Sequence, residues 1–257
     1  MIAPWFERDP TAFAALQALL LARYGTLRTR IEDGVAVVQG SYGIVHDGHE
    51  IDRYQLRIAL PADYPNDLPI VWETGGRIPR DDIDRHVFPT NGALCVGVPV
   101  ALWITLGGNF SIDRFLDSPI RTYLIGNGLV EAGQPWPHGH WSHGANGLLE
   151  FYRDHLGITD PVALLQFLAS LLDNRVRGHW SCPCGSATII RKCHSTSVAD
   201  LRALPKEILL WSLKAILDHL HKKSAPVGRL RHLRGGDGQA FGHLGPIPIR
   251  FASNAAR

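Results

Sequence analysis

Three of the four cysteines lie close together in the sequence, and their spacing suits a metal ion. Cys182 and Cys184 are separated by one proline, and Cys193 is followed directly by His194. Thiolates and a neutral imidazole are preferred ligands of Zn²⁺, and four of them complete a tetrahedral shell. A complete shell leaves no position for a substrate, so we expect a structural zinc ion that helps this part of the chain to fold. A redox role of the thiols is the alternative.

The residues around this cluster resemble a known zinc motif. The Cys-Pro-Cys-Gly-Ser run at 182–186 is similar to the start of the SEC-C motif, which ends in a Cys-Cys or Cys-His pair. Eight residues separate Cys184 from Cys193, as in that motif. The resemblance implies a small zinc module that mediates docking to another protein.

The remaining cysteine, Cys95, stands apart from this cluster in a segment rich in glycine and proline, residues 86–99. A lone cysteine is commonly a small buried hydrophobic residue, and its position alone does not make it a nucleophile. The sequence around Cys95 is therefore needed to distinguish a buried hydrophobic residue from a nucleophile.

Two stretches near Cys95 resemble the ubiquitin-conjugating enzymes. Residues 64–73 (Tyr-Pro-Asn-Asp-Leu-Pro-Ile-Val-Trp-Glu) are similar to the family's Tyr-Pro-x-x-x-Pro-x-Val strand, and residues 91–95 (Asn-Gly-Ala-Leu-Cys) to its Asn-Gly-x-Ile/Leu-Cys. Trp103 follows Cys95 by eight residues, where those enzymes also carry a tryptophan. The resemblance implies that Cys95 accepts a carboxyl group as a thioester and passes it to an amine. His86, Asn91 and Trp103 are expected to shape its pocket.

Two departures from the family pattern bear on this chemistry. The family's His-Pro-Asn is not intact, so His86, Thr90 or backbone N–H groups would have to support the tetrahedral oxyanion. In addition, Asn127 occupies a position that is usually acidic in the family, 32 residues after Cys95. We expect the nearby carboxylate of Glu131 to take that role.

A group of three histidines, His138, His140 and His143, follows between Trp136 and Gly144. They could ligate a metal ion, or stabilise a loop through hydrogen bonds, or position and deprotonate the incoming amine near Cys95. Bacterial relatives of the conjugating enzymes carry a similar Trp-Pro-His-Gly-x-Trp-x-His-Gly segment. The resemblance favours the catalytic use, so all three are candidate catalytic residues.

The hydrophobic pattern predicts the elements that must position these residues. A helix is expected to begin at Asp9-Pro10, a capping residue followed by proline at the first helical position. Alternating apolar residues between Val35 and Trp72 predict an antiparallel meander. A largely irregular stretch is expected at 75–108, and further helices are expected to begin near residues 111, 147, 160 and 205. Pro119 should break or kink the first of these later helices.

The predicted fold class is α+β. It combines a ubiquitin-conjugating-like fold, made of an N-terminal helix, an antiparallel β-meander and C-terminal helices, with a small zinc-binding helical module. Four regions are expected: a catalytic core at 1–130, a His/Trp-rich loop with a helical extension at 131–178, the zinc module with its helix at 179–223, and a basic, mobile tail at 224–257.

The composition is that of an ordinary globular chain, with 45% hydrophobic and 19% charged residues in 257. No run reaches the roughly 18 apolar residues that a membrane-spanning helix needs, and the N-terminus lacks a secretory pattern. We therefore expect a cytoplasmic protein without a membrane partner. Residues 221–257 carry seven Lys or Arg against one Asp, but such tails are commonly just solvated, and nucleic acid is not expected as a partner.

The resemblance also implies a biological setting. The prokaryotic conjugating enzymes that this chain resembles act in antiphage cyclic-oligonucleotide signalling systems. The acyl donor would then be a cGAS/DncV-like nucleotidyltransferase or a ubiquitin-like protein, and the acceptor a protein or another amine. The sequence carries no nucleotide-binding fingerprint, so either a separate enzyme activates the carboxyl group or the acyl group comes by another route. The alternatives are a non-catalytic scaffold with the conjugating fold, or a Cys/His peptidase in which an imidazole and an Asn or Asp converge on Cys95.

Overall fold

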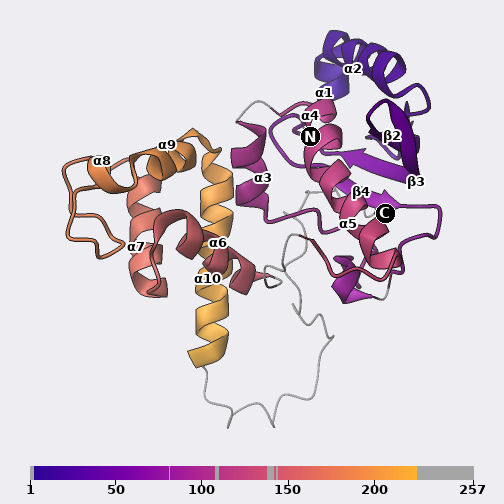
Figure 1. Cartoon of the computed structure of the whole chain (residues 1–257). Coiled ribbons are helices and arrows are strands. Elements are labelled where there is room, and N and C mark those ends of the chain that lie inside the picture. The colour runs from indigo at the N-terminus through magenta and orange to yellow at the C-terminus, as the bar shows by residue number, and fades with distance from the viewer. Residues whose placement is uncertain (1–2, 81, 108–109, 138–141, 143, 225–257) are drawn as a thin grey trace, which may run out of the picture. The chain divides into compact units, whose positions relative to one another are not determined.

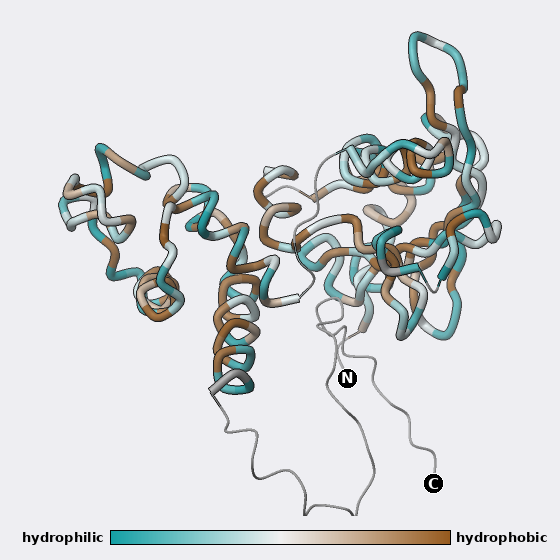
Figure 2. The backbone as a smooth tube through the Cα atoms, turned by 60° about the horizontal axis from the view of Figure 1, so that its bottom comes forward, coloured by the Kyte–Doolittle hydropathy of each residue, from teal (hydrophilic) through white to brown (hydrophobic). Residues whose placement is uncertain are grey.

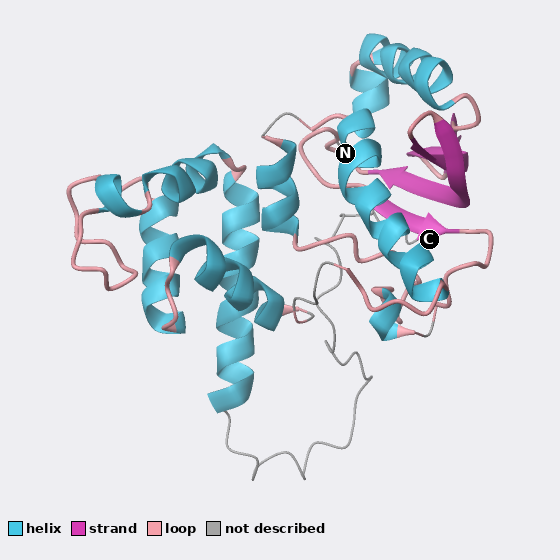
Figure 3. Cartoon of the chain, in the orientation of Figure 1, coloured by secondary structure: helices cyan, strands magenta, loops and turns pink. Residues whose placement is uncertain are grey.

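The computed structural model describes residues 3–80, 82–107, 110–137, 142 and 144–224 (Figure 1). The described residues form two compact units, called here the N-terminal unit (3–80, 82–107 and 110–137) and the C-terminal unit (142 and 144–224). All the described strands belong to the N-terminal unit, whereas the elements described in the C-terminal unit are helices (Figure 3).

The N-terminal unit is built on one antiparallel sheet whose strands follow in chain order. The strands are β1 (Arg28–Glu32), β2 (Val35–His46), β3 (His49–Leu60) and β4 (Ile70–Glu73). Asp-Gly pairs at 33–34 and 47–48 connect the first three strands, and both residues of each pair have positive φ, as a tight hairpin turn requires. The predicted α+β class and the predicted antiparallel meander are confirmed.

The helix before the sheet begins where the sequence predicts. Asp9 caps α2 (Pro10–Tyr24), because its Oδ1 accepts a hydrogen bond of 2.9 Å from the backbone N–H of Ala12. Leu16 and Leu20 are the buried residues of α2. A short helix that the sequence did not predict, α1 (Trp5–Arg8), precedes it, and the Trp5 ring lies 4.8 Å from that of Tyr64.

The helices after the sheet pack against it through two buried tyrosines. The hydroxyl of Tyr42 on β2 donates to the carbonyl of Leu116 at 2.9 Å, and that of Tyr54 on β3 donates to Leu124 at 3.1 Å. In Figure 1, α4 and α5 accordingly lie across the sheet. The elements of this part are η1 (Ile83–Arg85), α3 (Pro99–Leu106), α4 (Ile112–Phe115), η2 (Leu116–Ile120) and α5 (Arg121–Glu131).

Two details of these helices differ from expectation. The stretch that we expected to be irregular contains α3, which begins with Pro99 at its first position and buries four apolar residues. Pro119, expected to break or kink its helix, lies in η2, a single wide π-helical turn that joins α4 to α5. A π-helical turn accommodates the missing N–H of proline without ending the helix.

The C-terminal unit consists of helices packed around α10. Its elements are α6 (Ala145–Leu156), α7 (Pro161–Leu172), α8 (Ile190–Cys193), α9 (Ser195–Ala203) and α10 (Lys206–Ser224). Both α6 and α7 contact α10. The turns of α10 alternate between hydrophobic and hydrophilic residues (Figure 2), with Leu209 and Ile216 among its buried residues. Within the described residues no single helix is long and apolar enough to span a membrane, and only α6 with α7, bent by 75° at their break, meet the criterion together.

Candidate functional site

The C-terminal unit brings the four predicted zinc ligands together. The sulfur atoms of Cys182 and Cys184 are 3.3 Å apart, and those of Cys184 and Cys193 are 3.6 Å apart. The Nδ1 atom of His194 lies 3.2 Å from the sulfur of Cys182 and 3.2 Å from that of Cys193. All four donor atoms lie within 4.8 Å of one another. The predicted juxtaposition of these four residues is therefore confirmed.

The backbone explains why these residues meet. Ser181 pairs with Ile189 in an isolated antiparallel bridge, and the N–H of Cys182 donates to the carbonyl of Thr188 at 2.7 Å. Gly185 makes the tight turn between the two sides with φ of 80°. The short helix α8 follows at once and ends at Cys193, so the second pair of ligands returns to the first.

The donor set fits a tetrahedral Zn²⁺ ion. Zinc–sulfur bonds of about 2.3 Å place two thiolates about 3.8 Å apart, and a thiolate and an imidazole nitrogen about 3.6 Å apart. The hydrogen bond from Ser186 lowers the pKa of Cys184, whereas burial raises that of Cys182. A cation in the cluster would favour ionisation of all three thiols.

The cluster lies against the end of α6. Gly157, the C-cap residue of that helix, has φ of 67°. A Cβ atom added there would lie 3.1 Å from the Cβ of Cys184 and 3.5 Å from Cε1 of His194. The absence of a side chain at Gly157 thus lets α6 and the Cys/His cluster pack in direct contact.

In the N-terminal unit, Cys95 ends a small hairpin that is joined to the sheet. Val87 pairs with Leu94, and the N–H of Leu94 donates to the carbonyl of Val71 on β4 at 2.7 Å. The N–H of Cys95 donates to the carbonyl of His86, also at 2.7 Å. The cysteine backbone is therefore held from both sides of the hairpin, while its side chain stays half-buried.

The surroundings of Cys95 keep its thiol protonated. Burial raises the pKa of the thiol to about 11, and a hydrogen bond from the backbone N–H of Gly97 offsets only part of that effect. Among the described groups that shift this pKa, there is no imidazole. The arrangement differs from that of a thiolate–imidazolium pair, in which the pKa of the cysteine is strongly lowered.

His86 directly precedes the Val87–Leu94 pair of the cysteine hairpin and is buried. Its backbone has φ of 54°, which is uncommon for a residue with a side chain. Its ring centroid lies 4.6 Å from that of Trp136. Trp136 in turn lies against Gly126 of α5, where an added Cβ would be 3.0 Å from the indole. His86 and Trp136 thus form an aromatic pair between the hairpin and α5.

The other residues predicted around Cys95 have different surroundings. The side-chain Oδ1 of Asn91 accepts a hydrogen bond of 3.0 Å from the N–H of Ala93. The backbone carbonyl of Asn91 accepts one from the indole N–H of Trp72. Asn91 therefore stabilises the hairpin turn. Thr90 is exposed in the same turn. Trp103 is buried in α3, with its ring centroid 6.3 Å from that of Phe110.

The predicted histidines His138, His140 and His143 lie outside the described residues, as does the predicted basic tail from residue 225. Of residues 138–143, only Ser142 is described. Its N–H and hydroxyl both donate to the carboxylate of Glu150 on α6, at 2.7 Å and 2.6 Å.

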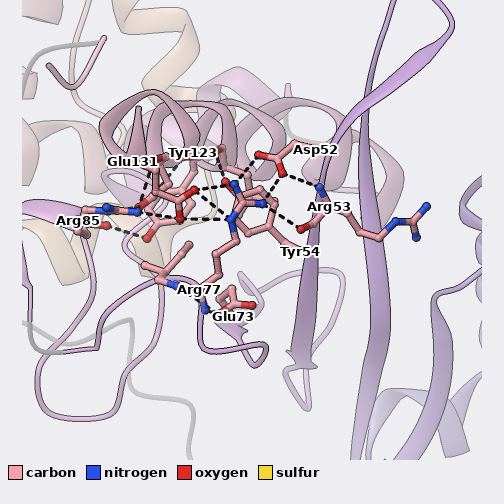
Figure 4. Close-up of polar contacts among 11 residues, drawn as sticks. Asp52, Arg53, Tyr54, Glu73, Arg77, Arg85, Tyr123 and Glu131 are labelled. Atoms are coloured by element: carbon pink, nitrogen blue, oxygen red, sulfur yellow. Dashed lines mark hydrogen bonds and ion pairs between the residues drawn. The ribbon is translucent and has the colours of Figure 1, made fainter. Parts of the chain in front are cut away.

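A network of charged groups joins α5 to the sheet and to η1 (Figure 4). Arg77 donates to Glu131 at 2.6 Å and to Asp52 at 3.1 Å, and its guanidinium lies 4.2 Å from the centroid of the Tyr54 ring. Burial alone would raise the pKa of Asp52, but the hydrogen bonds from Arg77 and from the N–H of Arg53 outweigh it and lower that pKa. Glu131 is therefore engaged in ion pairs in this structure.

Asn127 and Tyr123 belong to the same helix and also contact η1. Asn127 is fully buried and accepts a hydrogen bond of 2.7 Å from the guanidinium of Arg85. The hydroxyl of Tyr123 donates to the carbonyl of Arg85 at 2.8 Å. Sequence reasoning did not identify Tyr123, Arg85 or Arg77, because the contacts that bring them together span 25 to 54 residues.

The site and the fold define an α+β protein with a Cys/His cluster in one unit and a half-buried cysteine in the other. No protein-family model, curated protein or solved structure matches this chain. The function is therefore inferred from the residues of the chain itself.

Proposed function

We propose that this protein is a ubiquitin-conjugating-like acyl transferase that carries a partner's C-terminal carboxyl group as a thioester on Cys95. The observation that carries the proposal is the setting of Cys95: a half-buried thiol on a hairpin fixed to the sheet, with its pKa raised to about 11. The order of the elements supports it, since α2, a four-stranded meander, the cysteine and then α3 to α5 follow one another as in a conjugating fold.

A raised pKa suits a residue that stores an acyl group. A thiol of high pKa is a poor leaving group, so its thioester exchanges and hydrolyses slowly until an aligned amine attacks. Burial disfavours the charged thiolate but does not oppose a neutral thioester. The same property distinguishes Cys95 from a peptidase nucleophile, which an adjacent imidazole keeps ionised.

The reaction has two steps. In the first, the sulfur of Cys95 attacks the carbonyl carbon of an activated thioester donor, the new C–S bond forms, and the donor's thiol leaves with the proton. In the second, a neutral amine attacks the Cys95 thioester, an amide bond forms, and Cys95 regains its proton. The donor would be a cGAS/DncV-like nucleotidyltransferase or a ubiquitin-like protein in a cytoplasmic antiphage system, activated by a separate enzyme.

In this proposal the second unit binds a structural zinc ion. Cys182, Cys184, Cys193 and His194 would supply its four ligands, and the ion would stabilise the packing of this cluster against the end of α6. A complete ligand shell leaves no open coordination position, so the module would dock a donor or target and not take part in the chemistry.

Co-expression with candidate donors and activating enzymes tests the proposal. Wild type, Cys95→Ser and Cys95→Ala are compared by intact mass under denaturing, non-reducing conditions. Wild type should carry a donor-sized adduct that thiols remove, Cys95→Ser a thiol-resistant ester, and Cys95→Ala no adduct.

A chemical donor removes the dependence on an unidentified activator. A glycine-terminated peptide thioester is incubated with the same three proteins, and the acylated residue is located by peptide mass analysis. Acylation confined to Cys95 supports the proposal. If wild type gains no adduct from either source, the scaffold interpretation replaces it.

A further inference from the structure

One face of α5 contacts Arg85 and His86, the two residues that lead into the cysteine hairpin. Tyr123, Asn127 and Glu131 are four residues apart in sequence, so they form a single stripe along the helix. Each of the three contacts Arg85 at the end of η1. Figure 4 shows Arg85 beside Tyr123 and Glu131 of this stripe.

The side chain of Arg85 contacts Asn127 and Glu131 of this stripe. Its Nε donates to Oδ1 of Asn127 at 2.7 Å, and its Nη2 lies 3.4 Å from Oε1 of Glu131. Arg85 is 8% exposed and Asn127 is 0% exposed. Because a buried guanidinium is costly without partners, these two contacts hold η1 firmly on α5.

The backbone after Arg85 is bound by Tyr123. The phenol donates to the carbonyl of Arg85 at 2.8 Å and lies 3.3 Å from the carbonyl oxygen of His86. The carbonyl of His86 also accepts the N–H of Cys95 at 2.7 Å. One peptide group is thus shared between the α5 tyrosine and the cysteine.

The conformation at His86 needs such support. A left-handed backbone at a residue with a side chain is unfavourable and persists where surrounding contacts impose it. At His86 those contacts are the hydroxyl of Tyr123, the N–H of Cys95 and the Trp136 ring, which lies tilted by 39° against the imidazole. Loss of one of them would let the peptide relax and the hairpin end move.

We propose that Tyr123 is a positioning residue for Cys95: its hydroxyl fixes the His86 peptide and thereby the orientation and reactivity of the Cys95 thiol. The role in acyl transfer rests on the function proposed above, whereas the role in fixing the thiol does not. Tyr123→Phe removes the hydroxyl and keeps the ring. Tyr42→Phe is the matched control, because Tyr42 is also buried and also donates to a backbone carbonyl, that of Leu116.

The first measurement is alkylation of Cys95 by iodoacetamide at pH 8, which forms a carbamidomethyl thioether and releases iodide. Peptide mass analysis follows each cysteine separately. We expect Cys95 to react about five times faster in Tyr123→Phe than in wild type, and within twofold of wild type in Tyr42→Phe. Equal rates in all three proteins would overturn the proposal.

Hydrogen exchange on the wild-type chain provides a measurement that needs no variant. The amide of Cys95 is expected to exchange as slowly as amides in the middle of β3. Its N–H donates to the carbonyl of His86, and the hydroxyl of Tyr123 holds that carbonyl in place. Exchange at the rate of an exposed loop would also overturn the proposal, even if Tyr123→Phe did not fold.

The final measurement separates positioning from a purely structural role. With the peptide thioester as donor and free lysine as acceptor, Tyr123→Phe should lower kcat about tenfold and leave KM for lysine within twofold, while Tyr42→Phe changes neither. Faster alkylation with an unchanged kcat would overturn the catalytic part. If wild type forms no acyl adduct, the proposed function fails, and alkylation alone still decides whether Tyr123 fixes the thiol.

Discussion

Gly157 is the position at which a single methyl group should report on the Cys/His cluster. It ends α6 with φ of 67°, and an added Cβ would lie 3.1 Å from the Cβ of Cys184. The change Gly157→Ala therefore combines two costs, a backbone conformation unfavourable to alanine and a contact that is too close. The close contact affects the Cys/His cluster, whereas the backbone cost does not.

The two costs can be assigned approximate sizes. A left-handed conformation costs an alanine about 1–2 kcal/mol relative to glycine. Carbon atoms prefer separations of about 3.5–4.0 Å, so the contact with Cys184 and His194 requires a shift of several tenths of an ångström, for which we assign about 1 kcal/mol. The free energy of unfolding of the C-terminal unit should fall by about 2–3 kcal/mol. Zinc affinity should fall only by the contact part, about fivefold.

Gly133→Ala provides the matched control. Gly133 follows α5 with φ of 78°, and nothing lies within 4 Å of an added Cβ. The control therefore incurs the backbone cost without the contact. Zinc transfer to a chromogenic chelator measures affinity, and urea unfolding measures stability. We expect Gly133→Ala to destabilise its own unit by about 1–2 kcal/mol and to retain zinc as wild type does.

Either of two results would refute this reasoning. If Gly157→Ala and Gly133→Ala retain zinc equally well, the ligands do not press against the end of α6. If neither variant nor wild type contains zinc after purification and reconstitution, the donor set does not bind the metal that its chemistry indicates.

Three further outcomes are expected. Cys182→Ser removes one ligand, so bound zinc should fall well below one ion per chain and the melting temperature should drop; metal analysis showing unchanged content would contradict the zinc assignment. Cys95, with a pKa of about 11, should react with iodoacetamide at pH 8 about 20-fold more slowly than an exposed cysteine peptide, and its rate should keep rising beyond pH 10; a plateau below pH 9 would contradict the raised pKa. Asp52→Asn should cost about 1–2 kcal/mol at pH 7, because Arg77 lowers the pKa of Asp52 and the charged form is stabilised only in the fold. That stability is present above the unfolded pKa of about 3.9 and is lost as pH falls through the lower folded value, so urea unfolding of the two proteins should converge at acid pH; a constant difference would argue against the ion pair.

The cluster could be predicted from the sequence because its geometry is local. Cys182, Cys184, Cys193 and His194 lie within thirteen residues, and a tight turn followed by one short helix is enough to bring them together. The contact with Gly157 could not be predicted, because it joins the cluster to a helix that ends 26 residues before Cys182.

The outline of the N-terminal unit was also predictable. Asp9-Pro10 marks the start of α2 through a capping carboxylate and a proline without an N–H, and strand alternation marks the meander. The helix α3 was not predicted because it is apolar on most sides: Val100, Leu102, Trp103 and Leu106 are all buried. A helix that is apolar on most sides shows no clear polar face, so its pattern is difficult to distinguish from other buried segments.

The sequence of α5 contains a signal that helix propensities could have identified. Gly126, Asn127 and Gly128 are poor helix formers, yet they stand in the middle of α5. Each is accounted for by a contact: Trp136 lies where a Cβ of Gly126 would be, Asn127 binds Arg85, and the carboxylate of Asp52 lies 3.2 Å from an added Cβ at Gly128. A helix that gives up local stability at three successive positions must be stabilised by its neighbours, and such conflicts concentrate where function restricts the choice of residue. In this chain the conflict lies at the helix that holds the peptide next to Cys95.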